Sequence, residues 1–598
     1  MQKTLNPVWE LDSFFPGGSE SKEFQTFLDV LKEKAAAFRH RLEQAESPVT
    51  LESAAPYADL VGELQKVMSG IYEGYSFTGC LAAQNQNDRK AIALSGRVQD
   101  INSVFDSALA QLDRFLSGIP SPVFEALVKR EPWSQAAFYL SERRQLSKDK
   151  MAPELESLAS ELAVDGYHGW SELYNTTVSQ FSIPFEENGK TELLSAGQAF
   201  NKLHSPDRET RAELFKRWEA GWAEQADFCA DALNHIAGFR LRLYGQRGWD
   251  SVHKEPLAIN RMTKETLDAM WGTVERNKEI FVRFLERKAK LLGVERLAWY
   301  DVDAPVGKTE KKISYEEGAA IIVEQFRSFS PKMAEFAAFA LENRWIEAED
   351  RPGKRPGGFC TSFPLEEETR IFMTYSGTAD NVSTLAHELG HAFHDHVMKG
   401  MPPVAKNYAM NVAETASTLA ETIVSDAAIR AETDKEAKIA LLSDKIQNAT
   451  AMFMNIHARF IFETNFYAER EKGLVGVERL NELMTEAQQQ AFHGALSEYH
   501  PHFWASKLHF YATDVPFYNF PYTFGLLFAS GIYQTARDAV GGFEDRYIAL
   551  LRDTGSMSVE ELALKHLGAN LQQPEFWQRA IDLFAADVEE FLALTEEA

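Results

Sequence analysis

The sequence is poor in cysteine, in long hydrophobic runs and in positive charge. Its three cysteines, Cys80, Cys229 and Cys360, are widely spaced and match no metal or redox motif, which fits a reducing compartment. Apolar runs such as Ala319–Val323 are far shorter than the roughly 20 residues that cross a bilayer. The first residues also lack the basic start and apolar run of a secretory signal. We therefore expect a cytoplasmic protein that does not associate with membranes.

Basic residues are outnumbered, with 62 Lys and Arg against 88 Asp and Glu and a formal net charge of -26. This charge would repel a phosphate backbone, and no basic stripe is dense enough to overturn the average, so a nucleic-acid partner is not expected. An acidic lining would instead favour cationic peptides. The hydrophobic content of 45% is ordinary for a globular protein, and 598 residues suffice for two or three fused lobes. The sequence leaves the oligomeric state open.

The chain is predicted to be mainly α. Apolar residues recur at three-to-four spacing in five long segments: Ser21–Ala45, Leu60–Gly79, Arg89–Gly118, Thr263–Leu292 and Asp434–Lys472. Strands are expected in two places only. A hairpin follows Thr176 and turns at Glu187-Asn188-Gly189, and one strand covers Arg370–Tyr375. A loop rich in Gly and Pro, Asp350–Gly358, precedes that strand.

The segment NVSTLAHELGHAFHDHV carries a candidate metal site. Four apolar residues share one helical face, and Gly400 with Pro402-Pro403 ends the helix; they are Val382, Leu385, Leu389 and Phe393. On this helix His387 and His391, four apart, project from the same side and can hold one zinc ion at about 2.0 to 2.1 Å. Glu388 is rotated by about 100° and lies beside the metal, where its carboxylate can take a proton from zinc-bound water. The alternative is an exposed helix with two unrelated histidines.

A third ligand is expected in the next amphipathic segment, NVAETASTLAETIVSD. Its apolar stripe leaves Glu414 and Glu421 together on another face, and a turn containing proline can bring Glu414 onto the metal. Glu421 is either an acceptor for a histidine N–H or a solvated charge. For His394, one turn beyond His391, a supporting hydrogen bond and simple packing are both open. His396 is expected at the surface.

These residues resemble the helical zinc oligopeptidases related to thimet oligopeptidase, and especially the oligoendopeptidase F branch. The resemblance runs in order through GGFCTSF, IFMTYSGTADNVSTLAHELGHAFHDHV, AETASTLAE and HFYATDVPFYNFPYTFG, between Gly357 and Gly525. The tracts LAWYDVDAPVG and VWELDSFFP are also similar to that branch. Together these blocks are much more specific than the five residues of the metal motif.

The resemblance implies a large two-lobed helical metallopeptidase with a deep central channel and a small β-sheet near the metal-binding helix. We expect an N-terminal helical lobe over residues 1–200 and a catalytic domain over residues 201–598. It implies one catalytic zinc ion held by His387, His391 and Glu414, with Glu388 as general base, and hydrolysis of internal bonds in short peptides.

The resemblance also assigns His509, Tyr518 and Tyr522 to contacts with the substrate carbonyl or the oxyanion. From the residues alone this segment would be half-buried aromatic packing. It departs from the thimet type, because the spacing from His509 to Tyr518 is longer and Gly525 stands where another tyrosine is expected.

The strand before the metal-binding helix is a reasonable platform for an extended peptide, paired through its backbone. Two other enzymatic readings stay open, a carboxypeptidase of related fold and a dipeptidyl carboxypeptidase, although the blocks HPFT and HESQ of helical zinc carboxypeptidases are missing. A non-catalytic peptide-binding protein is the remaining alternative.

Overall fold

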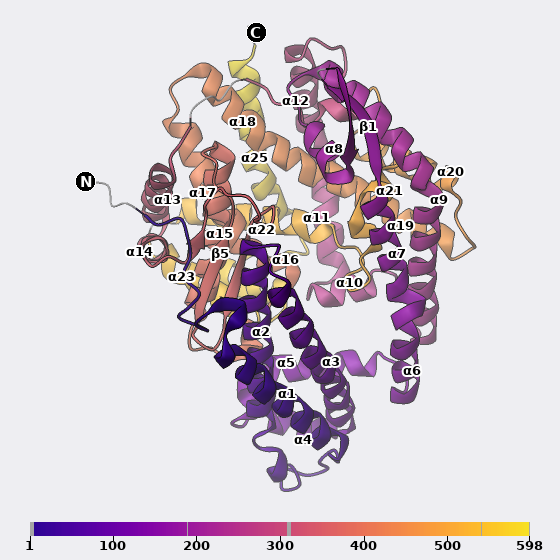
Figure 1. Cartoon of the computed structure of the whole chain (residues 1–598), viewed down its shortest axis with the longest axis vertical. Helices are drawn as coiled ribbons and strands as arrows, with labels where there is room; N and C mark the ends of the chain where they lie inside the picture. Colours follow the sequence, from indigo (N-terminus) through magenta and orange to yellow (C-terminus); the bar gives the residue numbers. More distant parts are fainter. Residues whose placement is uncertain (1–4, 188, 308–311, 540, 597–598) are drawn as a thin grey trace.

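The computed structural model describes residues 5–187, 189–307, 312–539 and 541–596. The fold is mainly α, as predicted (Figure 1). Three predicted helices are found close to their expected bounds: α1 (Lys22–Glu43), α2 (Leu60–Gln84) and α3 (Arg89–Gly118). Asp88 caps α3, because its side chain accepts hydrogen bonds from the backbone N–H groups of Lys90 and Ala91.

Two segments expected as single helices are interrupted. Thr263–Leu292 forms α11 (Lys264–Arg276) and α12 (Lys278–Leu291). At the break, Asn277 Nδ2 donates to the Thr273 carbonyl and to Gln578 Oε1, both at 2.8 Å, so its side chain competes with the helical backbone. Asp434–Lys472 forms α18 (Lys435–Thr450) and α19 (Ile456–Arg470), separated by a π-helical turn over Ala451–Asn455.

The remaining helices lie either before α15 in the sequence or from α15 onward. Those before α15 are α4 (Ser121–Leu127), α5 (Ala137–Lys148), α6 (Pro153–Ala163), α7 (Gly169–Gln180), α8 (Ala196–Lys202), α9 (Arg208–Gln246), α10 (Lys254–Ile259), α13 (Tyr315–Phe329) and α14 (Pro331–Glu342). Those from α15 onward are α15 (Ala379–Val397), α16 (Met410–Ala413), α17 (Thr415–Ala431), α20 (Val477–Ala491), α21 (Phe503–Ser506), α22 (Phe520–Asp538), α23 (Phe543–Asp553), α24 (Val559–Leu567) and α25 (Pro574–Leu594). Figure 1 shows α1 to α5 gathered at one end of the molecule, below the orange and yellow helices.

The helices pack around two hydrophobic cores. One core takes its residues from the first 140 positions and adds Phe363, Phe372 and Val404 from later in the chain. The ring of Phe14 stacks on that of Phe363, with centroids 3.8 Å apart, so a strand of the later region completes the N-terminal core. The other core runs from Ala163 to Phe591. The domain boundary near residue 200 and the deep channel remain predictions.

The sheet next to α15 has three strands in the order β3-β5-β4, with β3 (Ile346–Glu347) parallel and β4 (Phe359–Phe363) antiparallel to β5 (Glu368–Phe372). The predicted strand over Arg370–Tyr375 is therefore found, but it ends at Phe372 and lies in the centre of the sheet. Both of its edges are paired, so the prediction that this strand receives an extended peptide is wrong. Among the described residues no other strand pairs with the outer edge of β4, where Ser76 Oγ donates to the Ser362 carbonyl at 2.6 Å.

The predicted hairpin consists of β1 (Ser182–Glu187) and β2 (Lys190–Ser195) in antiparallel register. Gly189 lies at its turn with a φ of 74°, where a side chain would be strained. Asn188, the middle residue of the predicted turn, lies outside the described residues. No helix in the described part of the chain has the length and apolar character needed to span a membrane.

Candidate metal centre

The metal motif lies in the middle of α15, as its apolar spacing predicts. Thr378 caps the helix by accepting a hydrogen bond from the Asn381 backbone N–H at 3.1 Å. The predicted apolar face is buried, and the helix ends before Gly400, which has a φ of 72°. This face fixes the rotation of α15 and turns His387 and His391 toward α17.

Glu414 lies at the break between α16 and α17, so the segment predicted as one helix has two parts. Its Oε2 accepts a hydrogen bond from Ser417 Oγ at 2.9 Å, which holds the carboxylate in place. α15 and α17 touch through Gly390. A Cβ on Gly390 would lie 2.5 Å from the Ala416 carbonyl oxygen and 2.6 Å from Ser417 Cα. The glycine within the motif thus lets the helix bearing the histidines approach the start of α17 beside Glu414.

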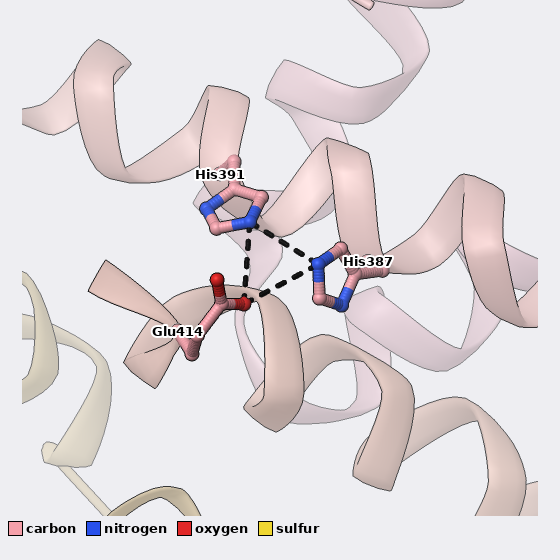
Figure 2. Close-up of side chains that lie close together, drawn as sticks. All are labelled: His387, His391 and Glu414. Carbon is pink, nitrogen blue, oxygen red and sulfur yellow. Dashed lines mark hydrogen bonds and ion pairs between the residues drawn. The ribbon is translucent and has the colours of Figure 1, made fainter. Parts of the chain in front are cut away.

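Three candidate ligand atoms form a small triangle, one each from His387, His391 and Glu414 (Figure 2). The two Nε2 atoms are 3.2 Å apart, and Glu414 Oε2 lies 3.4 Å from Nε2 of His387 and 3.5 Å from Nε2 of His391. Bonds of about 2.0 to 2.1 Å to a tetrahedral zinc ion would separate ligand atoms by roughly 3.3 to 3.4 Å. The triangle therefore matches three corners of such a site.

The hydrogen bonding around His387 also suits a metal. Its Nδ1 is bonded to the Glu421 carboxylate, as expected if Glu421 accepts a histidine N–H. This bond turns Nε2, with its lone pair, toward the other two ligand atoms. Burial opposes charging of His387, but the Glu421 hydrogen bond and the charges of Glu421, Glu388 and Glu414 raise its pKa to about 9. Without a metal, His387 therefore carries a second ring proton at neutral pH, on Nε2, and a bound cation would displace this proton.

The pKa values of the two acids of the site shift in opposite directions, although the histidines lower both. Burial would raise the pKa of Glu414, but the hydrogen bond from His391 and the positive charges of both histidines lower it to about 2. Burial raises the pKa of Glu388 despite the nearby histidines. Its side chain is only 5% exposed, and Oε2 meets no hydrogen-bond partner within the described chain. Glu414 is thus held as a carboxylate, whereas the pKa of Glu388 lies above its ordinary value.

Two further glycines make room around the acids. A Cβ on Gly358 would lie 3.1 Å from Glu388 Oε1 and 3.3 Å from the Phe372 carbonyl oxygen. A Cβ on Gly525 would lie 3.1 Å from Glu414 Cβ. The departure at Gly525 therefore has a physical reason, because α22 passes directly against Glu414 and leaves no space for a tyrosine there.

His509, Tyr518 and Tyr522 form a cluster beside the metal centre. The His509 ring lies 5.1 Å from that of Tyr518 and 6.3 Å from that of Tyr522, and the two tyrosine rings are 6.0 Å apart. Burial raises the pKa of Tyr522, and Tyr518 and the charge of Glu414 add to the increase. Tyr522 therefore keeps its proton and can donate a hydrogen bond.

Comparisons with known proteins show the family of the chain. The model of peptidase family M3 matches residues 202–583, and that of oligopeptidase F matches residues 116–182. The chain belongs to peptidase family M3. It is 23% identical over 598 residues to oligopeptidase PepF of Bacillus subtilis, covering 98% of this chain and 86% of the relative. An oligoendopeptidase F homologue of Lactococcus lactis is 24% identical over 437 residues, 70% of each chain.

Solved structures show the same fold as this M3 peptidase. A protein from Chlamydophila abortus superposes with a TM-score of 0.82 at 19% identity, and the match covers 98% of both chains. Oligoendopeptidase F from Enterococcus faecium gives a TM-score of 0.71 at 17% identity, covering 96% of this chain and 99% of the other. The two-lobed helical metallopeptidase fold that the resemblance implies is therefore confirmed at the level of its helical architecture.

The other histidines of the motif in this M3 peptidase do not join the triangle. His394 is fully buried, and its Nε2 lies 2.9 Å from Thr554 Oγ1 while its ring stacks on that of Tyr408, so it both packs and forms a hydrogen bond. His396 is half-buried against the Phe336 ring, at 4.6 Å, so the surface position expected for it is wrong. Sequence reasoning missed the roles of Gly358 and Gly390, because close approach depends on how the elements cross.

Proposed function

We propose that this M3 peptidase is a zinc-dependent oligopeptidase that hydrolyses internal bonds of short peptides, with Glu388 as general base. The ligand triangle of His387, His391 and Glu414 carries the proposal, because its edges fit a tetrahedral zinc site. When bound, zinc would supply Lewis-acid chemistry, lowering the pKa of a water toward about 7 and polarising the substrate carbonyl.

Glu388 would receive the proton that the attacking water loses and then deliver it to the departing amine. Its burial and raised pKa support both transfers, since a base with a pKa nearer neutrality can also act as an acid.

Tyr518 and Tyr522 would donate hydrogen bonds to the developing oxyanion, a contribution worth about 10² to 10³ in turnover. His509 would assist in its neutral form. Burial and the neighbouring cations Arg459 and Lys507 together lower the pKa of His509 to about 4. At neutral pH it can therefore donate a single N–H without carrying charge.

An extended peptide would pair with the outer edge of β4. Within the described chain this strand pairs only with β5. It begins directly after Gly358, whose backbone lies against the Glu388 carboxylate. Backbone pairing there would bring a scissile carbonyl toward the general base and would read little of the side-chain sequence. Broad tolerance of peptide sequence follows.

The test compares the wild type, Glu388→Gln and a surface control, Glu482→Gln, on quenched peptides of graded length and on a folded protein. Glu482 lies on α20, outside the segments that carry the proposed site residues, and its side chain is 62% exposed. We expect Glu388→Gln to retain one zinc ion per chain and lose turnover by about 10² to 10⁴-fold, with the control unaffected. Undiminished cleavage by Glu388→Gln would contradict the assigned base, and efficient digestion of folded protein would contradict the restriction to short peptides.

A further inference from the structure

Lys507 lies two residues before His509, in a pocket whose wall is largely aromatic. It follows α21 directly, and its Nζ lies 4.4 Å from the ring centroid of Phe200 and 5.2 Å from that of Phe503. Trp299, Tyr300 and Asp303 line the same pocket. The aromatic faces hold the ammonium group by cation–π attraction and leave its hydrogen atoms free of oxygen partners.

No described residue accepts a hydrogen bond from Lys507 Nζ or forms an ion pair with it within 4 Å. Asp303 lies in the same pocket and acts on Lys507 only from a longer distance. Burial and, to a smaller extent, the positive charge of Arg459 together lower the pKa of Lys507 to about 7.

Arg459 is the second cation of this region. Its guanidinium lies 5.1 Å from the centroid of the same Phe503 ring that Lys507 approaches, so the two cations share one aromatic neighbour. Its Nε and Nη1 donate to the amide oxygens of Asn455 and Asn519, and within the described chain no carboxylate pairs with it. Asn455 ends the π-helical turn before α19, an irregularity that often marks functional sites.

Both cations act electrostatically on residues of the proposed oxyanion cluster. They lower the pKa of His509, and Arg459 also interacts electrostatically with Tyr522, which in turn senses the charge of Glu414. Two like charges held together out of water repel each other, and an anion between them would remove this repulsion and fill their unused donors. The peptide substrate of an oligopeptidase carries one such anion at a fixed place, its C-terminal carboxylate.

We propose that Lys507 and Arg459 bind the free C-terminal carboxylate of the peptide substrate, with the aromatic wall of Phe200, Trp299 and Phe503 around the last side chain. This inference rests on the proposed function. It predicts that the enzyme prefers short peptides with a free carboxyl end and cuts at a set distance from that end. The N-terminal side of the substrate then varies in length more freely than the C-terminal side.

The experiment uses one quenched peptide made both as the free acid and as the C-terminal amide. We expect the wild type to cleave the acid with at least about tenfold higher kcat/KM, the factor that 1.4 kcal/mol of binding represents. In Lys507→Met, which keeps the apolar stem of the side chain, the acid-to-amide ratio should fall to within about threefold of one. Lys507→Arg should restore the preference, because it returns a charged donor.

Lys264→Met is the matched control, since Lys264 is an exposed lysine paired with Asp268 within α11. It should keep the wild-type ratio. Equal cleavage of acid and amide by the wild type would overturn the inference, even if Lys507→Met failed to fold. A loss of the same size on both peptides in Lys507→Met would also overturn it, because a merely structural lysine would act in that way. Failure of the proposed function is distinct, because neither peptide would then be cut in a manner that depends on Glu388.

Discussion

Gly390→Ala tests whether the spacing between α15 and α17 sets the metal site. The new Cβ would lie 2.5 Å from the Ala416 carbonyl oxygen, whereas ordinary contact begins at 3.4 Å, so the start of α17 must retreat by about 0.9 Å. Overpacking of this kind costs about 1 to 3 kcal/mol, and the better helix propensity of alanine offsets about 1 kcal/mol of it. The net change in unfolding free energy is therefore small, about 0 to 2 kcal/mol.

The effect on the metal is larger than the effect on stability. Glu414 directly precedes α17, and metal sites tolerate only about 0.2 Å of error in ligand distances. We expect zinc affinity to fall about 10- to 100-fold and kcat/KM to fall about 10²-fold, the loss that a misplacement of 1 Å can cause.

The assay is a competition titration of the metal-free protein against a chromogenic chelator, with thermal melting alongside. Gly96→Ala on α3 is the control, because nothing lies within 4 Å of the added atom there. It should stabilise the protein by about 0.5 to 1 kcal/mol and leave zinc affinity alone. If Gly390→Ala bound zinc within twofold of the wild type, the close approach of the helices would not determine the site.

Two further predictions concern the same centre. Glu421→Ala removes the acceptor that orients His387 and should weaken zinc binding about 10- to 100-fold in the same titration, whereas an unchanged affinity would reduce Glu421 to a surface charge. Because the pKa of His387 is raised to about 9 in the metal-free site, zinc must displace a proton below that pH. The apparent affinity should therefore rise about tenfold per pH unit between pH 7 and 9 and then level off, and a plateau already reached at pH 7 would contradict the raised pKa.

Local patterns in the sequence predict local structure well in this chain. The spacing of apolar residues locates α1, α2, α3 and α15, and the four-residue interval between His387 and His391 places both rings on one side of α15. The break at Asn277 could not be predicted in this way, because one of its side-chain partners, Gln578, lies 301 residues away in the sequence.

Features that depend on how distant segments meet were predicted only in part. Glu414 was found because its helix must return past α15, but the small residues that permit this contact, Gly390 and Gly525, carry no signal in the spacing. The central position of β5 depends on pairing with β3 and β4, which no pattern within β5 records. His509 and the two tyrosines were selected by family resemblance, since the residues alone favour aromatic packing.

The stacking of Phe14 on Phe363 joins a residue near the start of the sequence to β4, in the sheet next to α15. The region matched by the M3 family model, residues 202–583, therefore contains one half of an interface whose other half is encoded some 350 codons upstream. A gene fragment that began at residue 202 would expose Phe363 and Phe372 to water. The N-terminal helices thus cover the apolar surface of the sheet that lies next to α15.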